Sequence, residues 1–526
     1  MRPSSFLLVI SILSAFVLPS LCDTENVTVD IEGATTIANT DRSFVCVTLD
    51  WWPAEKCNYG MCPWYQSSVL NLDLKNPILK NAIKAFNQPP LRVRIGGSLQ
   101  DQIVYKVGKN HPKCEKLKLV KGALFDFSAG CLNMCRWKKL NKLFQDSGAV
   151  VTFGLNALYG RSQLKNDTLW EGSWNSSNAR DFINHTISKG YNVDSWEFGN
   201  EISGDGVAAK VDVKQYSQDL IVLKALIDDL YKDKKKPMLL APGGFFDQDW
   251  FAKMLQNSGP NVVDAVTHHI YNLGPGGSKE LFGKMQDPFF LSQIAQTFKN
   301  AEETVKDFGP WSSAWIGEAG GAFNSGGPES GTFVDSFWYL DQLGMASKFN
   351  HKAYCRQALI GGNYALLDTQ TFIPNPDYYS ALLWHRLIGR RVLQATHQSS
   401  PYLRTYAHCG RDQNSITLVL INLSNSTAFN VSVQNDMNLY PPELKTNSAT
   451  LGGQREVYHL TPKDGNLTSH YVLLNGKLLN VSSTGEIPQI SPTITEASAP
   501  LRITPSSIVF VKFRNITAPA CADREN

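Results

Sequence analysis

Two glutamates have the sequence context of catalytic carboxyls. Glu201 ends the run SWEFGNE and Glu318 ends the run AWIGE, and each follows apolar residues and a glycine that permits a tight backbone turn. Two carboxyls about 5–5.5 Å apart can cleave an acetal, because one protonates the leaving oxygen and later activates water while the other attacks the carbon. Either glutamate alone would more often be a surface ion-pair partner, so the prediction depends on a fold that brings both together.

Eight short apolar runs supply elements that could do so. They are rich in β-branched or aromatic residues and are bounded by Gly, Pro, Asn or Asp, which is typical of strands. The predicted strands are 44–50, 91–96, 149–156, 194–199, 237–242, 263–271, 314–318 and 353–361. Helical stretches separate them, for example 214–231, where Leu220, Leu223 and Ile227 recur at spacings of three and four.

This alternation predicts a (β/α)8 TIM barrel over residues 44–375. The glutamates would then end the fourth and seventh strands, at the rim where the catalytic groups of such barrels lie. A doubly wound open sheet is the main alternative, but no G-x-G-x-x-G follows the first strand.

The sequence changes character beyond about residue 376. Helical periodicity gives way to short strands at 416–423, 428–433, 471–474 and 507–513, with prolines between them. Residues 376–526 are therefore predicted to form an antiparallel β-sandwich. The segment 23–43 is also β-like, and we expect it to add a strand to that sandwich.

The N-terminus indicates secretion. Arg2 precedes an apolar run from Phe6 to Val17, and residues 1–22 as a whole fit a signal peptide. This run is too short for a membrane span of about 20 residues, so no integral span is expected. Ten N-x-[ST] sequons predict surface glycosylation. They begin at Asn26, Asn166, Asn175, Asn184, Asn422, Asn425, Asn430, Asn466, Asn480 and Asn515.

The cysteines fit an oxidising compartment. Of the ten, Cys22 leaves with the signal peptide, so the odd number that remains implies at least one free thiol. Cys46 and Cys355 lie in apolar, strand-like runs, where a free thiol behaves as a small hydrophobe. The pairs Cys57-x4-Cys62 and Cys131-x3-Cys135 are better explained by disulfides or inert thiols than by metal.

Several long motifs resemble glycoside hydrolase family 79, and in particular its plant heparanase-like β-glucuronidases. The motifs are LRVRIGGSLQD, SWEFGNE, VTHHIY, AWIGEAGGAFNSGG, FWYLDQLGMASKFNHKAYCRQALIGGNYALLD and NPDYYSALLWHRLIGRRVL. The resemblance runs from about residue 40 to the C-terminus. It implies that Glu201 is the proton donor, that Glu318 is the nucleophile, and that the preceding Asn200 hydrogen-bonds the sugar 2-hydroxyl.

The same resemblance implies further roles. Tyr271, in the element His269-x-Tyr271, would hydrogen-bond the nucleophile, and Cys409 would form a disulfide with Cys521. The residues implied to line the substrate site are Asp50, Ser98, Asn200, His269, Tyr271, Gly326, Gly327 and Tyr364. Ser98 replaces a threonine of the animal heparanases. The stretch Asn324-Ser325-Gly326-Gly327 departs from their glycine-rich stretch, so the resemblance does not assign which backbone N–H groups there donate to the substrate.

These features predict a single-chain, monomeric, secreted enzyme acting on a carbohydrate that bears β-glucuronic acid. Adjacent His268 and His269 cannot face one metal from a strand, so neither a metal nor a cofactor is expected. A net charge of +3 gives no argument for nucleic acid. The alternatives are a catalytically inactive glycan-binding homologue, a serine hydrolase and a barrel glycosidase of another sugar specificity. Both carboxyls are present and no G-x-S-x-G occurs, which disfavours the first two.

Overall fold

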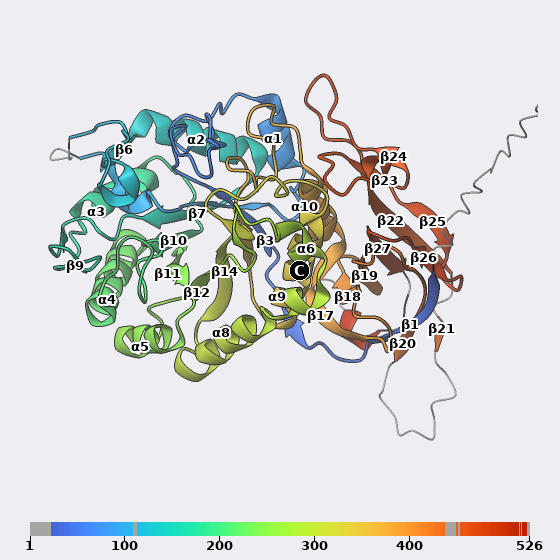
Figure 1. Cartoon of the computed structure of the whole chain (residues 1–526). Helices are drawn as coiled ribbons and strands as arrows, with labels where there is room; N and C mark the ends of the chain where they lie inside the picture. Colours follow the sequence, from blue (N-terminus) through green and yellow to red (C-terminus); the bar gives the residue numbers. More distant parts are fainter. Residues whose placement is uncertain are drawn as a thin grey trace, which may run out of the picture.

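The computed structural model describes residues 23–108, 113–436, 449–450, 453–514, 516 and 518–522. It consists of a barrel ringed by helices and, beside it, a domain of β-strands (Figure 1). The expected signal peptide at 1–22 and the sequon at Asn515 lie outside the described residues.

Eight parallel strands close into a barrel in the order β10-β11-β12-β14-β16-β3-β4-β7. Each coincides with one of the eight predicted strands, so the predicted barrel is confirmed. They are β3 (Val45–Leu49), β4 (Arg92–Ile95), β7 (Val150–Leu155), β10 (Ser195–Phe198), β11 (Met238–Phe245), β12 (Ala265–Ile270), β14 (Ser313–Ala319) and β16 (Tyr354–Arg356).

Helices cover the outside of the barrel (Figure 1). They are α1 (Pro77–Lys84), α2 (Met134–Ser147), α3 (Ser177–Ser188), α4 (Val213–Leu230), α5 (Gln248–Ser258), α6 (Leu281–Gln286), α7 (Pro288–Ser292), α8 (Ala295–Phe308), α9 (Asp335–Lys348) and α10 (Pro376–Leu387). Helix α4 coincides with the predicted helix and begins after Asp212, whose carboxylate caps the backbone N–H groups of Lys214 and Gln215. Within the described part of the chain, no helix is both long and apolar enough to cross a membrane.

Helices α9 and α10 lie between the barrel and the β-domain, and they are buried almost all round. The predicted domain boundary after residue 375 falls directly before α10, which packs against β3 of the barrel as well as β17. The two parts therefore share a continuous apolar core.

The β-domain is built on the strand path β21-β20-β1-β17-β18-β19-β27-β22-β23-β24, and β2, β25 and β26 pair beside this path. The strands are β1 (Thr24–Glu32), β2 (Ala38–Asn39), β17 (Ile388–Thr396), β18 (Leu403–Gly410), β19 (Ser415–Asn422), β20 (Ala428–Asp436), β21 (Ala449–Thr450), β22 (Gln454–Pro462), β23 (Val472–Leu474), β24 (Lys477–Leu478), β25 (Thr493–Glu496), β26 (Leu501–Ile503) and β27 (Ser507–Arg514). Strand β1 joins β17 and β20, as expected for the N-terminal segment.

The alternation of side chains on β19 explains how the β-domain is held. Leu418 and Leu420 pack in the sandwich core with Val29 of β1, although β1 and β19 are not neighbours in the sheet. Val419 and Ile421 point the other way, into the core that includes the barrel. Because successive residues of a strand face opposite sides, a strand buried on both faces reads as one continuous apolar run.

Six short strands form two-stranded additions to the barrel loops. They are β5 (Ile103–Lys106) with β6 (Gly130–Asn133), β8 (Ser162–Gln163) with β9 (Trp170–Glu171), and β13 (Gly274–Pro275) with β15 (Ala322–Phe323).

The four disulfides of the described residues correct part of the cysteine prediction. Cys409 pairs with Cys521, as the family resemblance implied, and Cys57 with Cys62. Cys46 and Cys355, expected to be candidates for a free thiol, instead bond to each other, because they are directly opposite on β3 and β16. Cys131 pairs with Cys114 rather than with Cys135, which is the exposed free thiol of the described residues.

One predicted glycosylation site is wrong. Asn422 is 0% exposed, and its amide nitrogen, the atom to which a glycan would be attached, donates to the carbonyls of Thr427 (2.8 Å) and Thr504 (2.9 Å). Asn430 is half-buried. The exposed sequon asparagines are Asn26, Asn166, Asn175, Asn184, Asn425, Asn466 and Asn480.

The Cys46–Cys355 bridge gives a testable prediction for stability. On the chain-entropy account a disulfide stabilises more when it closes a longer loop, reaching about 4.7 kcal/mol for roughly 100 residues. We expect Cys46→Ser/Cys355→Ser to lower the urea midpoint substantially, since the separation is 309 residues. The matched control, Cys57→Ser/Cys62→Ser, removes a bridge with a separation of 5 residues and should lower it less. Equal losses would contradict the entropic explanation.

Candidate active site

The C-terminal ends of the barrel strands surround a cavity of about 480 Å³, and both Glu201 and Glu318 line it. The other lining residues are Trp52, Lys56, Ser98, Phe125, Val207, Ala208, Phe245, Tyr271, Phe323, Asn324, Ser325, Gln357 and Tyr364. The fold therefore brings together the two glutamates that the sequence analysis selected.

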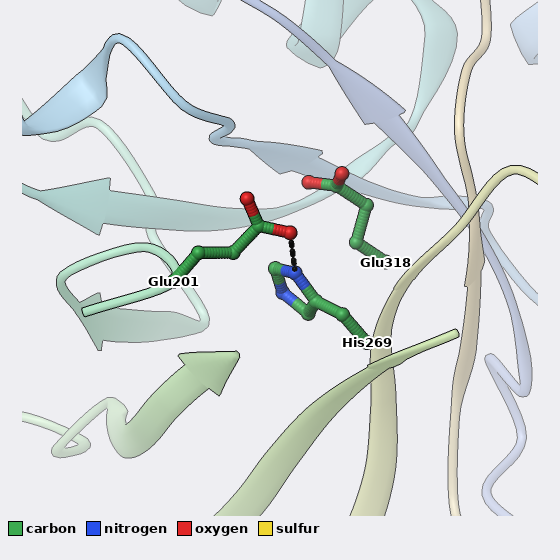
Figure 2. Close-up of side chains that lie close together, drawn as sticks. All are labelled: Glu201, His269 and Glu318. Carbon is green, nitrogen blue, oxygen red and sulfur yellow. Dashed lines mark hydrogen bonds and ion pairs between the residues drawn. The ribbon is translucent and has the colours of Figure 1, made fainter. Parts of the chain in front are cut away.

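The two carboxyls face each other across this cavity (Figure 2). One oxygen of each glutamate and one ring nitrogen of His269 all lie within 4.8 Å of one another. Such a spacing suits double displacement, in which one carboxylate attacks the sugar directly. Carboxyls that must leave room for a water between them stand about 6.5–9.5 Å apart.

Glu201 is aimed by an unusual backbone turn after β10. Gly199 has φ +75°, and Glu201 itself has φ +54°, a region that side chains other than glycine rarely adopt. Two hydrogen bonds hold the turn, from the Glu201 N–H to the Gly243 carbonyl (2.6 Å) and from the Val207 N–H to the Glu201 carbonyl (3.1 Å). Strained backbone that is fixed by its surroundings is common at functional sites.

Glu318 is aimed differently from the prediction. The glycine before it was expected to make a turn, but Gly317 lies within β14, where an added Cβ would come within 3.1 Å of the Thr267 side chain. The register between β12 and β14 shifts at this point, so that His269 is opposite Glu318. This irregularity points the carboxylate into the cavity.

Arg94 on β4 connects the acidic groups, and the sequence analysis missed it. Its guanidinium donates to Glu197 (2.6 Å), to Glu318 (2.9 Å) and to the side-chain oxygen of Asn200 (2.8 Å). Although burial opposes its charge, Glu197 and Glu318 raise the pKa of Arg94 further above its usual value. Arg92 and Arg94 alternate in an otherwise apolar strand, which was the signal that two charged side chains share the barrel interior.

Two residues of β12 and the segment after it contact the glutamates. The Tyr271 hydroxyl donates to Glu318 Oε1 at 2.6 Å, the contact that the resemblance implied. His269 Nδ1 is 3.0 Å from Glu201 Oε1. His268 faces the opposite side of the strand, where its ring nitrogen lies 2.9 Å from that of His351.

Burial shifts the pKa values of Glu201 and His269 in opposite directions. It raises the pKa of Glu201 to about 7, against a smaller opposing effect of Arg94. It lowers the pKa of His269 to about 4, against the effect of Glu318. Between these values the carboxyl of Glu201 carries a proton and the imidazole is neutral, so Glu201 can act as an acid near neutral pH.

Asn200 and Asp50 are buried next to the cavity. Because Arg94 binds the side-chain oxygen of Asn200, its amide group is oriented with Nδ2 as a donor, and this atom has no partner among the described residues. Asp50 accepts a hydrogen bond from Gln357 Nε2 (2.7 Å). Burial and then Glu318 raise the pKa of Asp50 to about 7.

The remaining predicted residues divide into two groups. Ser98 and Tyr364 line the cavity, whereas Gly326 and Gly327 lie behind its wall. The Gly327 N–H donates to Ser330 Oγ at 3.1 Å, so this N–H is already engaged within the loop and does not point to the substrate. Gly326 instead gives space to the Tyr364 ring, which a Cβ would approach to 3.0 Å.

The arrangement of Glu201, His269 and Glu318 could in principle hold a metal ion. Both oxygens of Glu318, however, already accept hydrogen bonds, from Tyr271 and from the Arg94 guanidinium. A cation there would also have to approach the positive charge of the Arg94 guanidinium, so the donor set fits a carboxylate nucleophile better than a metal ligand.

Several cavity residues carry no sequence signal of function. Gln357 follows the eighth strand, and Phe245, Val207 and Phe323 are apolar residues that a sequence analysis assigns to packing. Trp52 of the Trp51-Trp52 pair lines the cavity, with the Lys56 ammonium 4.2 Å from its ring centre, whereas Trp51 is buried in the core.

Comparison with known proteins agrees with this geometry. The model of "Glycosyl hydrolase family 79, N-terminal domain" matches residues 26–344. The chain belongs to glycosyl hydrolase family 79. Heparanase-like protein 2 of Arabidopsis thaliana is 51% identical, over 95% of this chain and 96% of its own. Baicalin-beta-D-glucuronidase of Scutellaria baicalensis is 39% identical, over 90% of each.

The fold of this family 79 chain also resembles more distant glycosidases. An alpha-L-arabinofuranosidase from Thermotoga maritima superposes with a TM-score of 0.63 at 12% identity, covering 93% of this chain and 99% of that chain. The family membership and the facing carboxyls identify the protein as a glycoside hydrolase of the retaining type.

The raised pKa of Glu201 predicts the alkaline limit of hydrolysis. Because the acid form is lost as pH rises through about 7, kcat/KM on an aryl β-glycoside with a poor leaving group should fall above that pH, approaching tenfold per unit. Asp50 titrates in the same range, so a control is needed. Glu201→Ala, assayed on a dinitrophenyl glycoside whose leaving group needs no proton, should not show this fall of kcat/KM at high pH. If the variant still shows the fall, the titrating group is Asp50 and not Glu201.

Proposed function

We propose that this hydrolase is a secreted retaining β-glucuronidase that cleaves β-linked glucuronic acid from glycans or glucuronide conjugates. The observation that carries the proposal is the pair of facing carboxyls in a cavity that Tyr364, a neutral donor, also lines. The 39% identity to a protein named as a glucuronidase supports the same sugar.

In the first step, Glu318 attacks the anomeric carbon. Its carboxylate is held ready by the Arg94 guanidinium and the Tyr271 hydroxyl, which bind its two different oxygens. As the bond from Glu318 to carbon forms, the glycosidic bond breaks and the electron pair leaves with the leaving oxygen. The product is a covalent glycosyl-enzyme.

Glu201 supplies the proton for that oxygen. A neutral His269 with its proton on Nδ1 donates to Oε1 of Glu201, which leaves Oε2 to carry the acid proton. In the second step the same carboxylate takes a proton from water, the resulting hydroxide attacks the anomeric carbon, and Glu318 is released. Asn200 Nδ2, oriented by Arg94, is suited to donate to the sugar 2-hydroxyl.

Residues that follow β16 and β3 suit an acidic sugar. Burial, followed by Asp50 and Glu318, holds the pKa of Tyr364 well above its usual value of 10, so the phenol stays protonated and can donate to a carboxylate. Below pH 7, Asp50 is itself mostly neutral and repels an anionic sugar little. Lys56 adds positive charge to the cavity.

Secretion is supported by the signal-like N-terminus, by four disulfides and by seven exposed sequon asparagines. Disulfides of this number are typical of oxidising compartments. A retaining glycosidase of different sugar specificity is the alternative. Activity on aryl β-glycosides that differ only at C5 decides between the two.

Replacing each glutamate tests the assigned roles. Glu318→Gln should abolish turnover, whereas Glu201→Ala should still form the glycosyl-enzyme slowly from substrates with good leaving groups. Added azide should rescue Glu201→Ala and give a β-glycosyl azide, detectable by NMR. General acid/base assistance contributes roughly 10²–10⁴-fold, so a smaller loss in Glu201→Ala would show that its role is misassigned. Initial release of the α-anomer would contradict double displacement.

Tyr364→Phe tests recognition of the sugar carboxylate. Removing this hydroxyl leaves the carboxylate of the bound sugar without a donor, which costs about 1–3 kcal/mol, so kcat/KM on an aryl β-glucuronide should fall by roughly tenfold or more. The residual rate on the matching β-glucoside, which lacks the carboxylate, should hardly change. Equal losses on both sugars would mean that Tyr364 only supports the barrel. A wild-type enzyme that prefers the glucoside would refute the glucuronidase assignment.

A further inference from the structure

Three successive backbone N–H groups hold the turn after β10 that aims Glu201. The Gly199 N–H donates to the carbonyl of Leu155 at the end of β7, at 3.1 Å. The Glu201 N–H donates to the carbonyl of Gly243 in β11, at 2.6 Å. The residue between them gives its N–H to a side chain instead. The turn is therefore fixed to both neighbouring strands, and one of its three bonds depends on a side chain that a substitution can remove.

That side chain is Asp101, in a single 3-10 turn (Gln100–Gln102) in the segment after β4. Its Oδ2 accepts the N–H of Asn200 at 2.8 Å, and its Oδ1 accepts the N–H of Ala157, in the segment after β7, at 2.7 Å. Asp101 is 5% exposed and is not one of the residues that line the cavity. Its carboxyl thus links two loops at the catalytic end of the barrel from behind the cavity wall.

The backbone of Glu201 depends on such support. Its φ of +54° lies in the left-handed region, which a residue other than glycine keeps only where the surrounding structure fixes it. Asn200 directly precedes Glu201, and Arg94 binds the side-chain oxygen of Asn200. Because Asp101 binds the backbone N–H of the same residue, the peptide that leads into Glu201 is held from two sides.

The chemistry of the contact requires a carboxyl group. The two N–H donors need one acceptor each, and a carboxyl has lone pairs on both of its oxygens in either protonation state. A carboxamide has only one oxygen, and its NH₂ group can only donate. Asparagine in place of Asp101 would therefore keep the size of the side chain but lose one of the two bonds.

We propose that Asp101 is a positioning residue for proton transfer, because it fixes the peptide between Asn200 and Glu201 so that the Glu201 carboxyl reaches the leaving oxygen. The inference rests on the proposed role of Glu201, but not on the identity of the sugar. A displacement of about 1 Å can lower a rate by roughly 10²-fold. Loss of the contact should therefore impair proton transfer much more than attack by Glu318, whose carboxylate has two donors of its own.

Asp101→Asn tests the proposal with aryl β-glycosides of the sugar that the wild-type enzyme hydrolyses best. On the phenyl glycoside, whose leaving oxygen needs a proton, kcat/KM should fall about tenfold or more. On the dinitrophenyl glycoside, which needs none, kcat/KM should fall less than about threefold. There kcat and KM should fall together, because breakdown of the glycosyl-enzyme needs Glu201 as a base, and added azide should restore kcat.

Asp264→Asn is the matched control. Asp264 precedes β12, at the other end of the barrel, where its Oδ2 accepts the N–H of Leu239 at 2.7 Å and pairs with the Lys224 ammonium at 3.0 Å. This variant should leave the ratio of the phenyl and dinitrophenyl values unchanged. That ratio does not depend on the fraction of enzyme that folds, and Asp101→Ser, a second variant, should change it in the same direction as Asp101→Asn.

Equal losses on the two glycosides, or no effect of azide, would overturn the inference if Glu201→Ala itself shows the selective loss on the phenyl glycoside. Absence of that selective loss in Glu201→Ala would refute the role of Glu201 and, with it, the role of Asp101. Added to Glu201→Ala, Asp101→Asn should lower kcat/KM by less than about twofold, since the contact acts through the carboxyl that is already removed. A full further loss in the double variant would contradict the proposal.

Discussion

The buried guanidinium of Arg94 is the interaction on which the site depends. It lies among Glu197 on β10, Asn200 just after β10 and Glu318 on β14, and it hydrogen-bonds all three. Without this positive charge, two carboxylates would be buried side by side in the barrel with no compensation, an arrangement that shifts the pKa of such groups until one is neutral. A buried ion pair of this kind adds little net stability. Its effect is to orient Glu318 beside Glu201, the group whose pKa burial raises.

The different surroundings of Glu318 and Glu201 determine their different roles in the reaction. Glu318 has two strong donors on its oxygens, whereas the carboxyl of Glu201 has one hydrogen-bond partner among the described residues, a histidine that burial keeps neutral. Identical side chains are thus suited to different roles because their surroundings differ. The retaining reaction needs this asymmetry, and the barrel provides it by placing the arginine and the tyrosine on the side of Glu318.

The sequence predicted those parts of the structure that have a local signature. Each barrel strand has its own apolar run, and the two glutamates follow such runs, so the strands and the glutamates could be recognised without knowing which residues are in contact. The role of Arg94 could not be recognised in this way, because it depends on which strands become neighbours. The pairing of Cys46 with Cys355 was missed for the same reason, since the first and last strands meet only when the barrel closes. Phe245 was missed because an exposed aromatic residue and a buried one look alike in a sequence.

That pairing has a consequence for how the catalytic part is held together. The backbone from Cys46 to Cys355 and the bridge between them form a covalent circle that contains both Glu201 and Glu318. A single proteolytic cut in a surface loop between these cysteines opens the circle but releases no fragment, because each new end is still joined to the other through the bridge. The packed strands on either side of the cut remain neighbours. The protein can therefore become a two-chain enzyme without losing any part of its catalytic barrel.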